Sequence, residues 1–395
     1  MIKKGYSILV LPGWYPNRTD PTLGNFVQKH AEAANLFCDV SVVYACPDPN
    51  LKNSNYEPVI EVINGILTII VYYKKIDSTT PLLSSIHKFR RYLHASLLGY
   101  KKLVEEKGKP DLIHLNILIR AGLIAWYLRL REGLKYVYTE NWTGFLPSNP
   151  LFNPYTFQHA IYKFIANRSK VLMPVTENLK NALIGHGIKG NYRIVGNVVD
   201  TDLFKPAHEE RKDSKFIFIH ISHAVDDHKN VSGILRATEK LKSIRTDFEL
   251  HIISDGKQDP HITYAEKLGL YNNQVFFTGT QSTSRVAEKL AKSDCLVLFS
   301  NYENLPCVIP EAMACGVPVI STNVGGIAEH ITEEYGILVK PRNENELVMA
   351  MKKIMEHSNN YSSQKLRSYA VKHFSYEMIG KDFYSAYKAA LDQHA

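Results

Sequence analysis

Two glutamates, Glu303 and Glu311, lie eight residues apart in the segment SNYENLPCVIPEAMACGVPVISTNVGG. They follow the apolar run Leu296–Ser300, which has the composition of a buried strand. Pro310 suits the first turn of a short helix, and Gly316 suits its end. Because doubly wound sheets bind ligands beyond the carboxyl ends of their strands, both glutamates are expected at a binding site.

The stretch from Asn304 to Val308, at the N-terminus of this helix, would direct free backbone N–H groups at the ligand, an arrangement that binds a diphosphate. Asn304, Leu305 and Pro306 are therefore candidate binding residues. Because carboxylates repel phosphates, we expect the two glutamates to accept hydrogen bonds from neutral hydroxyls: Glu303 from a sugar and Glu311 from a ribose diol. For an isolated pair of glutamates a simpler alternative stands, in which Glu311 complements the helix dipole and Glu303 is solvated.

The elements that must position these residues alternate in the same way in both halves of the chain. Short apolar runs recur from Tyr6–Leu11 to Arg193–Val195 in the first half, and from Phe216–Ile221 to Gly336–Val339 in the second. Helical patterns separate them, which predicts parallel sheets covered on both faces. The expected fold class is therefore α/β, with two Rossmann-like, doubly wound domains facing each other across a cleft.

The length of the chain, 395 residues, also favours two domains, and 45% hydrophobic with 22% charged residues is the balance of a core-forming protein. The turn-rich stretch Gly196–Pro206 marks the join. We expect an N-terminal domain at residues 1–198 and a C-terminal domain at residues 199–375. Five cysteines, an odd count without metal-ligand spacing, indicate a reducing cytoplasm and no metal site.

The net charge of +8 favours an anionic partner. Nucleic acid is disfavoured because the basic residues form no terminal block. Residues 86–103, IHKFRRYLHASLLGYKKL, predict a basic amphipathic helix that suits an anionic membrane surface. The alternative is a surface helix packed on its own domain. No run is long and apolar enough for a transmembrane helix, so at most a peripheral position at the inner face of a membrane is expected.

The segment from Ser300 to Ile331 is similar to the acidic E-x7-E motif of family 4 glycosyltransferases. Three further stretches support this resemblance: LPGWYPNRTDPTLGNF resembles the family's N-terminal glycine loop, Lys229-Asn230 its basic motif, and FSYEMIGKDFYSAY its returning C-terminal helix. The resemblance covers nearly the whole chain. It implies the GT-B architecture, with residues 376–395 returning to an N-terminal acceptor domain, and retaining chemistry without a metal.

The resemblance also implies roles for individual residues. In the family, the lysine that matches Lys229 binds the distal phosphate of the donor together with an arginine six residues earlier. Here that position is His223, which donates a cationic hydrogen bond only when it is protonated. A family histidine near the reacting carbon is replaced by Asn141, in YVYTENWTGF. Asparagine is neither acid nor base, but its amide can bind a sugar hydroxyl.

The loop after the first strand holds the remaining candidates of the N-terminal half. Gly24 would let the backbone approach the donor phosphates or the acceptor. Trp14 and Tyr15 either stack on an acceptor sugar or pack the loop onto its own domain, and Asn25 starts the following helix. No bound cofactor is expected, since the glycines of this loop lack the G-x-G-x-x-G spacing of a dinucleotide site. In the second half, Gly279 in the TGTQS loop is expected beside the base of the donor.

The expected function is the retaining transfer of a hexose from a UDP- or GDP-sugar to a saccharide or a lipid-linked saccharide, in cell-surface polysaccharide synthesis. Two alternatives stay open. One is a catalytically impaired protein that kept the donor pocket, suggested by Asn141 and His223. The other is a sugar-nucleotide epimerase, or a phosphorylase, on the same fold.

Overall fold

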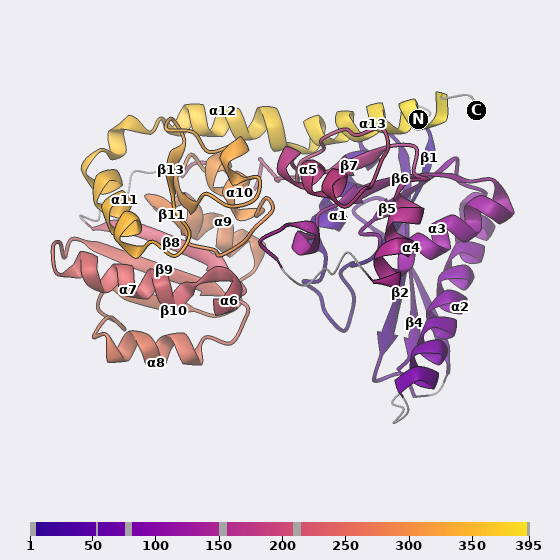
Figure 1. Ribbon diagram of the computed structural model, residues 1–395, viewed down its shortest axis with the longest axis horizontal. Helices are drawn as coiled ribbons and strands as arrows, with labels where there is room; N and C mark the ends of the chain where they lie inside the picture. The colour runs from indigo at the N-terminus through magenta and orange to yellow at the C-terminus, as the bar shows by residue number, and fades with distance from the viewer. Residues whose placement is uncertain (1–4, 53, 76–80, 150–155, 208–214, 393–395) are drawn as a thin grey trace.

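The computed structural model describes residues 5–52, 54–75, 81–149, 156–207 and 215–392. Two α/β units stand side by side, each built on its own sheet, and the last two helices run along one edge of both (Figure 1). The expected fold class is confirmed. The domain limits at 198 and 199 stay a prediction, although the two sheets fall on either side of them.

The first unit has a seven-stranded sheet in the order β3-β4-β2-β1-β5-β6-β7. Its strands pair in parallel except for β3 and β4. The parallel strands are almost wholly buried because helices cover both faces, which explains their continuous apolar runs. The strands are β1 (Ser7–Pro12), β2 (Asp39–Asp48), β3 (Tyr56–Ile63), β4 (Ile66–Lys74), β5 (Leu112–Asn116), β6 (Lys135–Glu140) and β7 (Leu172–Pro174).

The two edges of this sheet differ from the expectation. Strand β3 was not predicted, because it is a largely exposed edge strand with a proline, Pro58, and alternating polar residues. A turn with Asn64 and Gly65 at positive φ joins it to β4, as two-residue hairpins require. The expectation of a strand at Arg193–Val195 was wrong. That segment makes two backbone hydrogen bonds to β7, which is too short to support a longer ladder.

Helices on the two faces of the first sheet come from different parts of the chain. One face carries α2, α3, α4 and α5, and the other carries α1 and the C-terminal helix α13. The helices are α1 (Asn25–Asn35), α2 (Pro81–Lys107), α3 (Ile119–Glu132), α4 (Phe157–Ala166), α5 (Glu177–Gly185) and α13 (Tyr376–Asp392), with a 3-10 turn η1 (Thr143–Phe145).

The second unit has a six-stranded parallel sheet in the order β10-β9-β8-β11-β12-β13. Helices α7, α8 and α11 cover one face, and α9, α10 and α12 cover the other. The strands are β8 (Phe216–Ser222), β9 (Phe248–Ser254), β10 (Val275–Thr278), β11 (Cys295–Leu298), β12 (Val319–Thr322) and β13 (Gly336–Val339). The helices are α6 (Asp226–Lys229), α7 (Val231–Lys242), α8 (Asp259–Lys267), α9 (Thr283–Ala291), α10 (Val308–Ala314), α11 (Glu344–Glu356) and α12 (Ser363–Phe374), with 3-10 turns η2 (Ile327–Glu329) and η3 (Ser358–Asn360).

The chain passes between the units twice, and the two crossings touch. Val199 on the first crossing donates its N–H to the carbonyl of Phe374, and it forms a β-bridge with Ser375 on the second. Beyond Ser375, α13 lies against α1 and buries Phe383 and Tyr387 in the first unit. The C-terminal helix therefore returns to the N-terminal unit, as expected.

Helix α2 contains the basic stretch 86–103. Its apolar side chains, including Tyr92, Ala95 and Leu103, are buried against β2 and β4. The structure therefore favours the second alternative, a surface helix packed on its own domain, because that domain covers most of the helix's apolar face. The opposite face keeps exposed basic residues such as Lys88 and Arg90.

Candidate active site

Lys229, the last residue of α6, and Glu303, in the loop after β11, form a buried ion pair. The Glu303 carboxylate also accepts a hydrogen bond of 2.8 Å from the Ser300 hydroxyl. Burial raises the pKa of Glu303, but the charge of Lys229 and the nearby His228 outweigh burial and lower it to about 2. Glu303 is therefore ionised at neutral pH and provides a fixed negative charge beside Lys229.

Two histidines border this pair. Nε2 of His223 lies 3.2 Å from Nδ1 of His228, whose own Nε2 lies 3.5 Å from Glu303 Oε1. The His228 ring stacks on Tyr302 with centroids 4.3 Å apart. Burial lowers the pKa of His223, and the charges of Lys229 and His228 lower it further. His223 is therefore neutral at pH 7 in this structure, and an approaching phosphate would favour its cationic form.

Helix α10 carries Glu311 on the side that meets the first unit. The helix begins at Val308, so Pro310 is its third residue, and Gly316 follows its end with a φ of 74°. Lys29 of α1 reaches across the units, and its Nζ lies 3.0 Å from Glu311 Oε1. Burial lowers the pKa of Lys29, but the ion pair with Glu311 outweighs this and leaves it raised.

A chain of amide hydrogen bonds joins the E-x7-E loop to the first unit. The Asn304 amide donates to the Asn141 carbonyl (3.1 Å), and the Asn141 amide donates to Asn197 (3.0 Å). Asn197 in turn donates to the Leu305 carbonyl (2.8 Å), and Asn304 accepts from the Thr176 hydroxyl (2.8 Å). We call Asn141, Asn197 and Asn304 the amide clasp. Its buried amides bring the candidate residues of both units together.

The clasp leaves one acceptor unused. Asn141 Oδ1 is buried and has no hydrogen-bond partner among the described residues. A buried amide oxygen without a partner is unfavourable unless a ligand or water supplies a donor. Leu305 packs into the core of the second unit, and Pro306 follows it into α10. Asn304, Leu305 and Asn141 thus surround the point where the units meet.

Glu140 precedes Asn141 and was missed by the sequence reasoning. It ends β6, is fully buried, and accepts hydrogen bonds from the Tyr138 hydroxyl and from the backbone N–H groups of Asn141 (2.8 Å) and Trp142 (2.7 Å). Burial raises the pKa of Glu140 to about 7, although all three donors oppose that rise. A glutamate that ends the apolar run YVYTE was the available signal.

We expect Glu140→Gln to flatten the pH dependence of stability. The folded-state pKa near 7 exceeds the ordinary value of 4.5, so the folded state binds this proton more tightly. Below about pH 4.5 Glu140 contributes its full stabilisation of the folded state, about 3 kcal/mol. This contribution is lost as the pH rises through 7. Urea unfolding of both proteins between pH 5 and 8 measures it. If the unfolding free energies of the two proteins changed in parallel with pH, the raised pKa of Glu140 would be contradicted. Glu61→Gln, at an exposed glutamate, is the control.

The loop after β1 resolves the two alternatives for its aromatic residues. Tyr15 is 1% exposed and packs beside Tyr44, so it cannot stack on an acceptor sugar; it holds the loop on its domain. Trp14 stays half-buried, and Asn25 is exposed at the start of α1. Gly24 has a φ of 69°, and a Cβ there would lie 2.5 Å from the Trp14 carbonyl oxygen. Only glycine fits that turn.

Two further glycines control how loops approach the ion pair. A Cβ on Gly325 would lie 1.9 Å from the Glu303 carbonyl oxygen, and one on Gly256 would lie 2.0 Å from that of His223. The loops after β12 and β9 therefore press against the backbone of Glu303 and of His223. Gly279, after β10, has open space around it and stays a candidate neighbour of the base.

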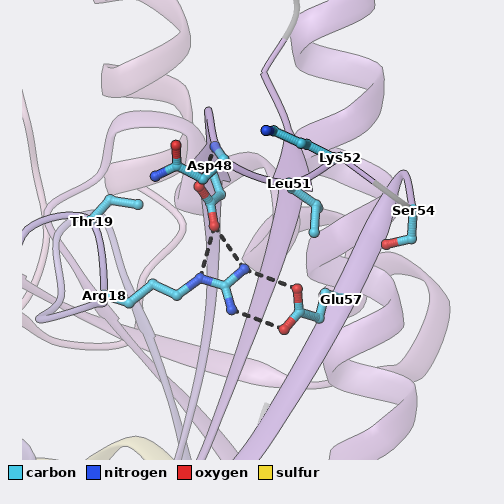
Figure 2. A pocket seen from close by; sticks show the side chains of 8 residues that line it. Arg18, Thr19, Asp48, Leu51, Lys52, Ser54 and Glu57 are labelled. Atoms are coloured by element: carbon cyan, nitrogen blue, oxygen red, sulfur yellow. Dashed lines mark hydrogen bonds and ion pairs between the residues drawn. The ribbon is translucent and has the colours of Figure 1, made fainter.

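The same loop after β1 borders a hollow of about 650 Å³ on the first unit (Figure 2). Arg18 makes a two-pronged contact with Glu57 at 2.9 Å and donates from Nε to the buried Asp48 at 2.8 Å. Its guanidinium lies 3.8 Å from the ring centre of Tyr72. The remaining lining residues are polar except for the buried Leu51: Thr19, Asn50, Leu51, Lys52 and Ser54. A rim of hydroxyls, amides and fixed charges is suited to a polyhydroxylated ligand.

Within the described ranges, no cluster of three or more histidines, cysteines or acidic residues could hold a metal ion. The helices in that part of the chain are also too short or too polar to cross a membrane.

Comparisons with known proteins agree on both halves of the chain. The family model for Glycosyltransferase Family 4 matches residues 30–203, and that for Glycosyl transferases group 1 matches residues 200–373. N-acetyl-alpha-D-glucosaminyl L-malate synthase of Bacillus anthracis is 32% identical over 58% of this chain and 60% of its own length. The putative teichuronic acid biosynthesis glycosyltransferase TuaC of Bacillus subtilis is 22% identical over 87% of this chain and 88% of its length.

Solved structures agree in fold. Sucrose-phosphate synthase from Thermosynechococcus elongatus superposes with a TM-score of 0.76 and 19% identity, covering 97% of this chain and 98% of that one. Anabaena HepE, solved in complex with UDP and glucose, has a TM-score of 0.72 and 16% identity, covering 97% of this chain and 100% of that one. Identities this low establish the shared architecture alone.

Proposed function

The chain belongs to glycosyltransferase family 4 and has the GT-B fold, and we propose that it transfers a hexose from a UDP- or GDP-sugar, with retention, to a saccharide or a lipid-linked saccharide. The observation that carries this proposal is the cluster of Lys229, Glu303 and His223 where the two units meet at the amide clasp. By analogy with TuaC, we propose a role in cell-surface polysaccharide synthesis.

In the proposed donor complex, Glu311 accepts hydrogen bonds from the ribose diol and Glu303 accepts from hydroxyls of the sugar. Lys229 and His223 hold the diphosphate, with Gly24 close to it from the first unit. Gly279 borders the base. The contacts support this arrangement: the pKa of Glu303 is lowered to about 2 beside Lys229, and Glu311 accepts from the cationic Lys29, so both carboxylates suit hydrogen-bond donors rather than phosphates.

The proposed chemistry is mainly electrostatic. As the glycosidic bond breaks, negative charge grows on the departing diphosphate, and Lys229 with protonated His223 stabilises it without a metal. The leaving phosphate oxygen takes the proton of the acceptor hydroxyl, which attacks from the same face and so retains the configuration. No protein base is required. The unpartnered Oδ1 of Asn141 then accepts a hydrogen bond from a sugar hydroxyl, which is the part an asparagine can take.

For the acceptor we propose the surface of the first unit that runs from Asn141 past Trp14 and Asn25 to the hollow at Arg18. Asp48 ends β2 and Asn141 follows β6, and β1 and β5 lie between these strands. Three strand spacings amount to about 14 Å. This exceeds the width of one sugar ring, so the surface fits a saccharide of several units better than a monosaccharide.

The test is calorimetric titration with UDP- and GDP-sugars, in the presence and absence of EDTA. We expect micromolar binding of one nucleotide-sugar that EDTA leaves unchanged, followed by transfer when acceptors are supplied. Binding that disappears with EDTA would refute metal independence. Binding without transfer to any acceptor would favour the alternative of a catalytically impaired protein. The observation behind that alternative is Asn141, which stands where the family has a histidine. Conversion of the donor without an acceptor would identify an epimerase.

A further inference from the structure

Helix α4 presents apolar side chains to solvent where a surface helix ordinarily presents polar ones. Phe157, Ala160, Ile161 and Phe164 follow one another at the spacing of one helical face, and Phe157 is 82% exposed. The opposite face is also apolar, because Ile165 and its neighbours pack on the sheet. Helix α4 therefore has apolar side chains on two faces, although only one of them is covered. Its polar residues are Gln158, His159 and Lys163.

Helix α3 extends this stripe. Leu123, Trp126 and Leu130 lie on its outer side, and Leu130 is 65% exposed. The Trp126 ring packs edge-on against Phe164 at 5.4 Å, and the two helices enclose an apolar hollow of about 310 Å³. We call the following residues the aromatic patch: Leu123, Trp126, Leu130, Phe157, Ala160, Ile161 and Phe164.

Positive charge borders the aromatic patch. The Arg168 guanidinium lies 3.5 Å from the ring centre of Phe164, and Arg129 donates to the Arg168 carbonyl. Residues 119–132 and 156–170 together hold six lysines and arginines and one acidic residue, Glu132. Helix α2 lies on the same face of the sheet (Figure 1). Its basic side chains Lys88 and Arg90 are exposed. An apolar stripe with aromatic residues inside a basic rim matches the chemistry of an anionic lipid surface.

We propose that the aromatic patch docks the protein on an anionic lipid bilayer. Charge complementarity identifies the bilayer as the binding partner. The apolar side chains of the patch can insert among acyl chains, and the neighbouring arginines and lysines can reach the phosphate headgroups. Helix α2 contributes mainly charge, because most of its apolar side is buried. Docking deepens the lipid-linked form of the proposed function and rests on it: Asn141 follows β6 and Phe157 begins α4, the next helix that packs on this face of the sheet, so a lipid-borne acceptor would leave the membrane at the same edge of the sheet as the site.

The experiment is sedimentation of the full chain with vesicles of phosphatidylcholine alone and of phosphatidylcholine with one third phosphatidylglycerol. We expect binding to the anionic vesicles only. Phe157→Ser combined with Phe164→Ser should weaken it by about tenfold or more, because two inserted aromatic rings are lost. Met349→Ser is the matched control: Met349 is 71% exposed on α11 of the other unit, and its variant should bind like the natural protein.

Trp126 supplies a second readout that does not depend on affinity. Brominated acyl chains should quench its fluorescence on docking, and Trp126→Phe should remove most of the quenching, since only two other tryptophans are present. Thermal unfolding and nucleotide-sugar titration of every variant show that it is folded. Equal binding by the Phe157→Ser/Phe164→Ser variant would overturn the proposal, as would quenching that survives Trp126→Phe. A dimer in solution that the same variant dissociates would assign the patch to a second copy instead.

Failure of docking and failure of the transfer reaction are distinguishable. Vesicle binding needs neither donor nor acceptor, so it can be positive in a protein with no transferase activity. Conversely, transfer to a water-soluble saccharide together with no vesicle binding would leave the proposed function in place and remove the membrane from it.

Discussion

Lys229→Ala is expected to lower the turnover number by about two to three orders of magnitude, as loss of one charge-stabilising donor does elsewhere. Lys229 is proposed to neutralise the departing diphosphate, whose charge grows only as the glycosidic bond breaks. The loss should therefore fall on kcat more than on KM. Steady-state kinetics with the nucleotide-sugar found by calorimetry measures both.

Lys229 also neutralises Glu303, which complicates a single substitution. Both side chains are buried, so removing the lysine leaves an unpaired carboxylate and can cost about 3–5 kcal/mol of stability. The double variant Lys229→Met/Glu303→Gln replaces the pair by neutral groups of similar size. We expect it to recover most of the thermal stability of the natural protein and to remain as slow as Lys229→Ala. Turnover that returns with stability would show that Lys229 acts only as a structural partner of Glu303.

Much of the fold could be predicted because burial dominates its pattern. Strands covered on both faces are apolar at nearly every position, and that signal locates β2, β5, β11 and β12 directly. Segments at the edge of a sheet lack this continuous apolar run. Strand β3 is polar and exposed because only one strand adjoins it, and Arg193–Val195 is apolar in part because it packs beneath α13, not because it extends the sheet.

The candidate site was predictable only as far as it is local in sequence. The eight-residue spacing put Glu303 in a loop and Glu311 on a helix, and both positions hold. The partners of these carboxylates come from elsewhere. Lys29 is 282 residues away from Glu311, and a lysine in the pattern of α1 looks like any surface lysine. The same limit hid Glu140, whose burial depends on how α4 and β7 close over the end of β6.

Burial also distinguished between two roles for the aromatic residues of the β1 loop, sugar stacking and loop packing, which residue type alone supported equally. Tyr15 and Trp14 are neighbours of similar type, yet Tyr15 is buried against Tyr44 and Trp14 is only partly buried. Both residues lie in the loop that follows β1, where no strand alternation fixes the direction of a side chain. Which side faces the domain depends on the loop's closure by Gly24, a tertiary contact that the sequence does not encode locally.

Glu311→Ala is expected to weaken nucleotide-sugar binding by about 100-fold. A ribose diol can donate two hydrogen bonds to the carboxylate, and bonds to a charged group contribute about 1.5–3 kcal/mol each. Losing them corresponds to roughly two decades in Kd after partial replacement by water. Titration calorimetry with the same nucleotide-sugar provides the measurement, and thermal unfolding provides the check on folding.

The ion pair between Lys29 and Glu311 offers the control that separates ligand binding from domain contact. Lys29→Met removes the same interdomain pair but keeps the carboxylate, and a partly buried pair of this kind should change affinity by no more than about fivefold. If Glu311 serves the ribose, Glu311→Ala must be far worse than Lys29→Met. If the two variants weaken binding equally, Glu311 acts by holding the units together. Lys29 bonds to Oε1, and a diol that donates to Oε2 would not displace it, so we expect the first outcome.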